Sequence, residues 1–173
     1  PLALKLKDLA SIDSTFRRVR KHQKNALRLM VGFNRRFAPH IVKMKSLLEI
    51  KQEPKSIVIT VNAGAIESDH WTQDTEIGGG RIIGEACHFI DLMQFLVGHP
   101  IINYHAVMIG NSPEIKVRDD KTSITLSFAD GSFGTIHYFA NGGKVFPKER
   151  IEVFCDDAVL QLDNYRMLKG FGW

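Results

Sequence analysis

The chain has few cysteines and lacks a long hydrophobic run. Cys87 and Cys155 are the only two cysteines among 173 residues. They show no paired metal-ligand spacing, so we expect free thiols in a reducing compartment rather than a disulfide framework. No apolar run reaches the roughly 20 residues that a bilayer crossing needs, and the first residues lack the pattern of a signal peptide. We therefore predict a soluble, cytoplasmic protein with no membrane partner.

An excess of one charge sign is also nearly absent. The net charge is +4, and much of it comes from residues 17–28, which are typical of the solvated end of a helix. That run contains no interleaved aromatic residues, so no nucleic-acid partner is expected. The remaining composition is that of one globular core. Because the chain begins at Pro1 rather than Met, we expect it to be part of a longer protein.

The hydrophobic pattern predicts helices in the first half of the chain. Apolar residues recur at three- and four-residue spacings in residues 6–24, 39–50 and 79–97, which predicts three helices. Between the first two, the short apolar run 27–33 predicts a buried strand.

From residue 56 the period of the pattern changes to two. Strands are predicted in 56–64 and 101–110, and hairpins in 122–140 and 149–164 with turns at Asp130-Gly131 and Asp156-Asp157. The expected fold class is α+β, with an open-faced, mostly antiparallel sheet of about six strands and helices packed on one face. Because strand 122–129 alternates polar and apolar residues, the uncovered face is a predicted surface for a homo-oligomer.

The clearest candidate site is the glycine-led helix, residues 78–97. Three glycines, 78–80, precede a helix on which Glu85 and His88 lie one turn apart. A histidine beside a carboxylate can serve as a base near neutral pH, because the carboxylate favours the imidazolium form. A packing histidine, a phosphate cradle and one half of a di-iron motif are the alternatives, and no second Glu-x-x-His supports the metal.

Two further stretches carry candidate binding residues. Arg35 and Arg36 follow the predicted strand 27–33, where their guanidinium groups could bind ligand oxygens or form surface ion pairs. Trp71 and Asp74 supply the flat ring and the carboxylate of a sugar site, although a loop tryptophan can equally fill a gap in a core.

The stretches "VGFNRRFAP" (31–39) and "GGGRIIGEACHFID" (78–91) resemble the Gfo/Idh/MocA oxidoreductase family. Members have an N-terminal Rossmann domain ending near a Glu-Lys-Pro signature, which Pro1 resembles, and a C-terminal α/β domain with an open sheet. The chain departs from the family pattern where Gly84 replaces the usual catalytic aspartate and Ala86 replaces a glycine. The second stretch is also similar to a subgroup in which this module follows a zinc-type alcohol dehydrogenase module.

The resemblance implies a division of the chain and a set of roles. Residues 1–33 would be the last helix and strand of a missing Rossmann domain, and residues 34–173 the substrate-binding and oligomerisation domain. The implied reaction is oxidation of a sugar or nucleotide-sugar hydroxyl with NAD or NADP, and the fragment alone would be inactive. The implied site residues are catalytic His88 and Glu85, substrate-binding Arg35, Arg36, Trp71 and Asp74, and cofactor-binding Pro1, Gly79 and Gly80, with no metal. The rival interpretations are a catalytically silent scaffold and a metal-dependent lyase.

Overall fold

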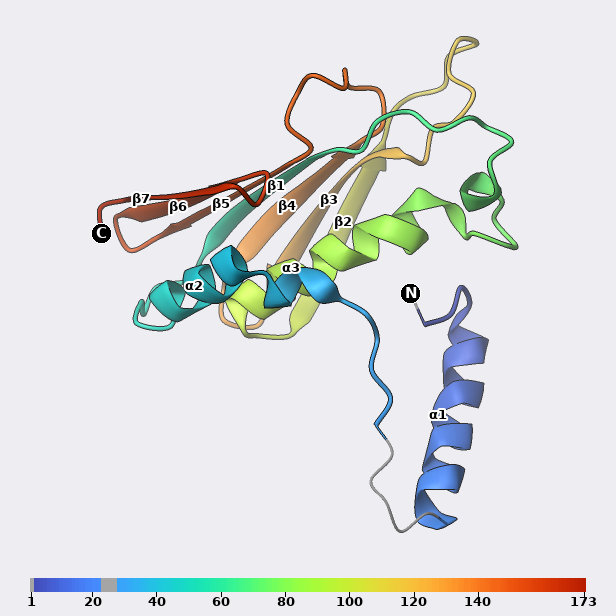
Figure 1. Ribbon diagram of the computed structural model, residues 1–173, viewed down its shortest axis with the longest axis horizontal. Helices are drawn as coiled ribbons and strands as arrows, with labels where there is room; N and C mark the ends of the chain where they lie inside the picture. Colours follow the sequence, from blue (N-terminus) through green and yellow to red (C-terminus); the bar gives the residue numbers. More distant parts are fainter. Residues whose placement is uncertain (1, 23–27) are drawn as a thin grey trace.

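A seven-stranded sheet forms the body of the protein (Figure 1). The structure is a computed structural model that describes residues 2–22 and 28–173. The strands are β1 Ser56–Asn62, β2 Ile101–Met108, β3 Lys121–Phe128, β4 Phe133–Phe139, β5 Glu149–Cys155, β6 Ala158–Asp163 and β7 Met167–Phe171. All six predicted strands from residue 56 onward are present, and the predicted α+β class is confirmed.

The first strand lies in the middle of the sheet, whose order is β2-β3-β4-β1-β5-β6-β7. β1 pairs with β4 in parallel and with β5 in antiparallel, and the remaining neighbours form antiparallel hairpins. The parallel pair and the short strand β7 were not predicted, because periodicity reports which residues face a core but not which strands lie side by side.

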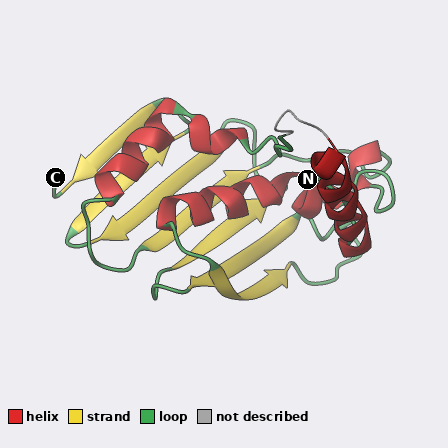
Figure 2. Ribbon diagram, turned by 90° about the horizontal axis from the view of Figure 1, so that it is seen from below, coloured by secondary structure: helices red, strands yellow, loops and turns green. Residues whose placement is uncertain are grey.

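Two helices cover one face of the sheet, as expected (Figures 1 and 2). They are α2, Pro39–Leu48, and α3, Cys87–Val97, which continues directly from a π-helix at Ile82–Ala86. Alternate residues of the strands point toward these helices, and β3 shows the pattern clearly, with Ile124, Leu126 and Phe128 buried. They pack with Leu92 and Leu96 of α3, each fully buried, into one hydrophobic core.

The other face of the sheet carries short polar side chains. On β3 and β4, Ser123 hydrogen-bonds His137 at 2.9 Å, and Thr125 hydrogen-bonds Thr135 at 3.0 Å. In Figure 2, which views the molecule from below, the helices α2 and α3 lie in front of the strands and leave the far face of the sheet without a helix in the described part of the chain. The predicted uncovered, mixed face is therefore present within the described residues.

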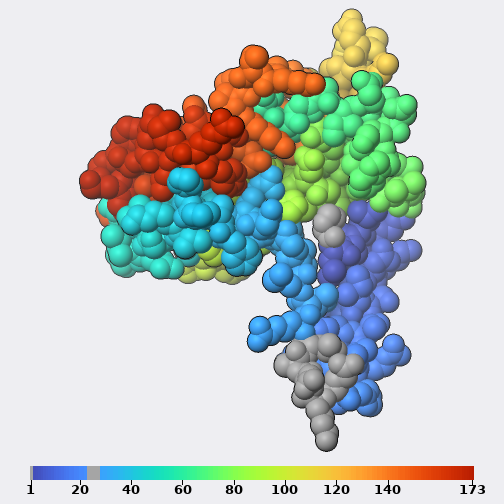
Figure 3. Space-filling model, viewed as in Figure 1, coloured from blue at the N-terminus to red at the C-terminus, as the bar shows by residue number. Residues whose placement is uncertain are grey.

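The N-terminal helix α1, Leu6–His22, extends away from the sheet (Figures 1 and 3). It forms as predicted, yet none of its residues is buried, and Leu6 of its apolar stripe is 85% exposed. The strand predicted at 27–33 is wrong for residues 28–33, which form no strand, while residue 27 lies outside the described part. A strand needs a neighbour for its backbone hydrogen bonds, and here Met30 is 79% exposed. In the described residues, no helix is both long and apolar enough to cross a membrane.

Candidate active site

The glycine-led segment lines a cleft of about 510 Å³ between the N-terminal segment and the start of the π-helix. Glu85, Trp71 and Gly80 lie on its walls, so the structure brings three of the predicted site residues together. The full lining is Leu2, Ala3, Leu4, Trp71, Thr72, Ile77, Gly78, Gly80, Arg81, Gly84 and Glu85.

Close packing explains why glycines occupy this turn. A Cβ added at Gly78 would lie 2.5 Å from the Trp71 carbonyl oxygen, too close for any side chain. Gly79 has a φ of +75°, and a Cβ there would overlap the Leu4 side chain. The loop therefore needs glycine to pack on its own chain, and Gly79 does not line the cleft.

Glu85 is held by two donors that the sequence did not point out. The Tyr138 hydroxyl, from β4, donates to Oε2 of Glu85, and Nη2 of Arg81 donates to the same oxygen at 3.1 Å. Arg81 also donates to the carbonyl oxygens of Gly64 at 2.6 Å and Ala63 at 3.2 Å, just past the end of β1. The i, i+4 spacing of Arg81 and Glu85 is a signal that could have indicated their pairing.

These contacts keep Glu85 ionised. Burial is the largest single influence and acts to raise the pKa of this carboxyl, but the hydrogen bonds from Tyr138 and Arg81 and the charge of Arg81 together outweigh it, so the pKa is lowered. Burial and the neighbouring carboxylate raise the pKa of Tyr138, so its hydroxyl stays protonated and donates.

In the described part of the chain, His88 does not hydrogen-bond Glu85, and it is not among the residues that line the 510 Å³ cleft. Its ring packs edge-on against Phe33, with ring centroids 5.5 Å apart, and its buried Nδ1 has no partner among the described residues. Burial and the nearby Arg35 cation lower its pKa, outweighing Asp91 and Glu85. The two carboxylates act on His88 in the expected direction, toward the imidazolium form, but burial and Arg35 outweigh them.

The π-helix accounts for this separation. Glu85 lies inside Ile82–Ala86, and His88 lies in the first turn of α3. A π turn closes with i→i+5 hydrogen bonds and so takes one residue more than an α turn. Two residues three positions apart across it consequently do not share one face, as they would in the predicted α-helix.

The two arginines are each paired with a carboxylate. Arg35 forms a two-point ion pair with Glu149, at 2.8 and 3.1 Å, and its guanidinium lies 4.3 Å from the centroid of the Phe89 ring. Arg36 forms a two-point pair with Asp91 of α3. Both lie within a 3-10 turn, Asn34–Phe37, rather than at the end of the predicted strand, and neither lines the 510 Å³ cleft. The observed contacts of Arg35 and Arg36 are therefore ion pairs, which was the alternative to ligand binding in the sequence analysis.

The remaining predicted residues lie around the loop before the glycines. Trp71 is 61% exposed at the cleft wall, so it does not fill the core. The Asp74 carboxylate accepts from the backbone N–H groups of Glu76 at 2.8 Å and Ile77 at 3.0 Å, which shapes the loop. Pro1 lies outside the described residues.

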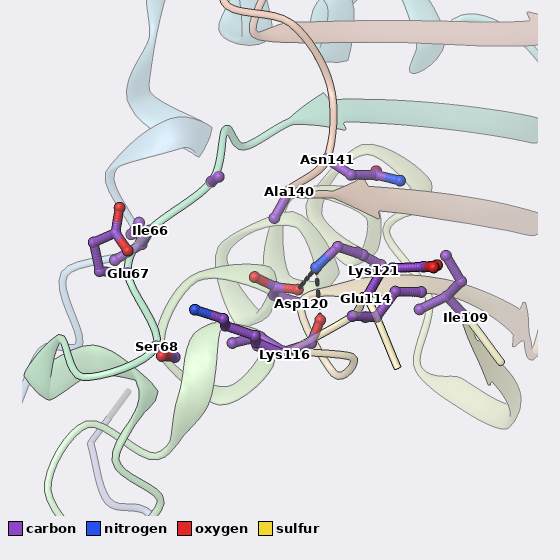
Figure 4. Close-up of a pocket in the computed structure, with 13 residues that line it drawn as sticks. Ile66, Glu67, Ser68, Ile109, Glu114, Lys116, Asp120, Lys121, Ala140 and Asn141 are labelled. Carbon is purple, nitrogen blue, oxygen red and sulfur yellow. Dashed lines mark hydrogen bonds and ion pairs between the residues drawn. The ribbon is translucent and has the colours of Figure 1, made fainter. Parts of the chain in front are cut away.

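A second cavity of about 370 Å³ lies at the rim of the sheet, near the ends of β1 and β4 (Figure 4). Its most buried polar group, Asp120, is paired with Lys121 at 2.6 Å, and none of the predicted site residues lines it. Within the described residues, no group of three or more His, Cys, Asp or Glu side chains is placed to hold a metal ion.

The sequence of the chain matches a known protein family. Residues 53–161 match the GFO/IDH/MocA C-terminal domain. The chain belongs to the GFO/IDH/MocA family. This match covers the sheet from β1 into β6 and includes Trp71, Glu85 and His88.

Three proteins that resemble the chain show how much of each relative's length it covers. It is 25% identical over 159 residues to the uncharacterized oxidoreductase YrbE of Bacillus subtilis, a match that covers 90% of this chain and 46% of YrbE. The WlbA dehydrogenase of Bordetella pertussis, solved with NADH and UDP-GlcNAcA, has a similar fold, with a TM-score of 0.75, 16% identity, and coverage of 96% of this chain and 52% of WlbA. The aldose-aldose oxidoreductase of Caulobacter crescentus, solved with glycerol, has a TM-score of 0.78, 16% identity, and coverage of 98% and 50%. The chain thus spans about half the length of these proteins.

Proposed function

We propose that this chain is the C-terminal, substrate-binding and oligomerisation part of an NAD(P)-dependent oxidoreductase that acts on a hydroxyl group of a sugar or nucleotide sugar. The observation that carries the proposal is the cleft lined by Glu85, Trp71 and the glycine loop in a member of this family. The relative WlbA was solved with NADH and a nucleotide sugar, which supports the same class of ligand here.

The proposed division of the chain places residues 1–33 with a preceding Rossmann domain and residues 34–173 in the substrate domain. The apolar stripe of α1, which is exposed or only partly buried, supports this division, since an amphipathic helix with no buried residue has an unused packing face. The half-length coverage of the relatives agrees with a missing domain.

The residues present fit one side of a nicotinamide site. The sequence contains no G-x-G-x-x-G, so the main dinucleotide pocket belongs to the missing half. The buried Nδ1 of His88 has no partner within the described residues, and Gly80 adds no side chain to the cleft wall. A bound nicotinamide would supply the hydride acceptor.

His88 is the proposed proton acceptor. Its lowered pKa keeps the imidazole neutral at pH 7, so it can take the hydroxyl proton as the carbon–hydrogen bond gives up its hydride. Glu85 would contact the substrate from the cleft wall, and Trp71 would offer its exposed ring to one face of a sugar.

The test is the full-length protein assayed against a panel of sugars and nucleotide sugars while nicotinamide absorbance is followed. Reduction of NAD or NADP that depends on one of these substrates supports the proposal. If no member of the panel is turned over and the protein still binds a sugar ligand, the second candidate gains. That candidate is a silent binding domain, which Gly84 in place of the family aspartate favours.

The oligomerisation part of the proposal concerns the polar face of the sheet. Two copies stacked on this face would cover Thr125 and Thr135, together with the exposed aromatic ring of Phe133. Light scattering of Thr135→Arg, which introduces a charge at the centre of the face, should show a smaller particle than the unaltered protein. Equal masses for the two proteins would contradict this interface.

A further inference from the structure

Arg81 is fixed to the rim of the sheet more firmly than an ordinary helix arginine. Its side chain is nearly buried, with 2% exposed, and its guanidinium donates to two backbone carbonyl oxygens past β1 as well as to Glu85. A buried cation needs such a set of acceptors, because losing them would leave its charge desolvated. Arg81 is therefore a fixed point beside the cleft.

Tyr138, on β4, donates to the same carboxylate. The residue is fully buried on β4, so its ring cannot turn away from the core. Its hydroxyl and Arg81 both donate to Oε2 of Glu85, while Oε1 has no hydrogen-bond partner within the described residues. The Glu85 side chain remains 46% exposed and lines the cleft.

We propose that Arg81 and Tyr138 are positioning residues that hold Glu85 as a carboxylate with Oε1 directed to the cleft, where it accepts a hydrogen bond from a ligand hydroxyl. This inference rests on the proposed function and gives Glu85 a role of its own, separate from His88. Two donors on Oε2 leave the carboxylate little rotational freedom, which reduces the ordering cost when a ligand binds.

A purely structural ion pair would not explain this arrangement as well. The two backbone carbonyl oxygens and Glu85 already accept from the Arg81 guanidinium without Tyr138, and a phenylalanine at position 138 would fill the same core space. The tyrosine hydroxyl adds a second donor to an oxygen that already has one, which stabilises the charged state of Glu85.

The charged groups around Glu85 set the sign of its pH dependence. Arg81, Lys148 and Arg35 act as cations near it, His88 lies beyond it on α3, and the Asp120 charge acts on Tyr138. Removing the Tyr138 hydroxyl removes a stabiliser of the carboxylate, so the pKa of Glu85 should rise. Any activity that needs ionised Glu85 would then be lost at a higher pH on acidification.

The test compares Tyr138→Phe with unaltered full-length protein in two measurements. The first is a carbon-13 NMR titration of the Glu85 carboxyl, which should show its pKa raised by about one unit, since a hydrogen bond to a charged group is worth about that much. The second is the pH profile of the binding affinity for the sugar oxidised in the panel, which reports Glu85 apart from the protonation of the proposed base His88. Its acid limb should move up by about one pH unit, which is a tenfold loss on the acid side.

A double variant separates positioning from general damage. In a Glu85→Gln background, Tyr138→Phe should change this affinity by less than about twofold, because additivity fails when one residue acts through the other. Tyr104→Phe, on the exposed edge strand β2, is the matched control and should change neither measurement.

The outcomes decide the inference and the proposed function separately. An unchanged carboxyl titration in Tyr138→Phe overturns the inference, as does a shifted titration with an unmoved acid limb. Equal losses of affinity in both backgrounds also overturn it. If the unaltered protein oxidises no sugar, the proposed function fails, and the carboxyl titration alone then decides whether Tyr138 holds Glu85 ionised.

Discussion

The two halves of the segment 78–98 behave in opposite ways. The first half, from Gly78 to Ala86, is a glycine turn and a π-helix whose polar groups reach the sheet rim and the cleft. The second half, α3, is an ordinary amphipathic helix with five fully or nearly buried apolar residues. The first half of this segment thus contributes residues to the candidate site, and the second half contributes residues to the hydrophobic core. His88 lies at the junction, so variants on either side of it should affect different properties.

The largest effect is expected for His88→Ala in the full-length protein. If His88 accepts the hydroxyl proton, kcat should fall by roughly two to four powers of ten, the usual contribution of general base catalysis. The melting temperature should change little, because Nδ1 has no partner in the described residues to be left unpaired. Initial rates and thermal melting on one preparation check both points.

His105→Ala, on the exposed strand β2, is the control and should keep the unaltered rate. A well-folded His88→Ala protein with near-normal kcat would contradict the proton-acceptor role.

Leu92→Ala tests the other half of the segment. The side chain is fully buried between α3 and the sheet, so its truncation should lower the free energy of unfolding by about 2–5 kcal/mol. Ile83→Ala, in the π-helix and 41% exposed, should cost under about 1 kcal/mol. Urea unfolding of both variants measures the difference, and equal losses would break the comparison.

Asp91→Asn tests the ion pair that α3 makes with Arg36. The change leaves the Arg36 guanidinium beside a neutral amide, which should cost about 1–2 kcal/mol, a modest value because the Arg36 side chain is 34% exposed. Asp13→Asn on α1 breaks a pair whose two side chains are both more than half exposed, and should cost under about 0.5 kcal/mol. Urea unfolding should rank the two variants in this order.

Gly98→Ala should have the smallest effect of the four changes. Gly98 ends α3 with a φ of +86°, a conformation that costs an alanine about 1 kcal/mol. Gly32→Ala has open space around it and a φ outside the left-handed region, so it should be nearly neutral. A loss for Gly98→Ala no greater than that for Gly32→Ala, measured by thermal melting, would contradict this account of the helix end.

The same contrast explains which parts of the molecule could be predicted. The alternation in residues 122–129 correctly predicted the buried face of β3, and the apolar spacing after residue 88 correctly predicted α3, because both patterns arise from contact with one core. The strand at 27–33 failed for residues 28–33 because an apolar run resembles a strand whether or not a partner strand is present. The sequence indicated Glu85 as a candidate site residue because it is a carboxylate near His88 and the glycines. It did not indicate that Arg81 and Tyr138 donate hydrogen bonds to Glu85.

The sequence alone determined the class of fold, the covered face of the sheet, the glycine turn and the family, since each is written in local spacing or in a motif. Tertiary structure decided that β1 lies beside β4, that Tyr138 reaches Glu85 across 53 positions, and that a π turn separates Glu85 from His88. Local spacing reports how a residue repeats along its own element. Contacts between elements depend on which strands lie side by side in the sheet. The one extra residue in a π turn changes the direction in which a carboxylate points.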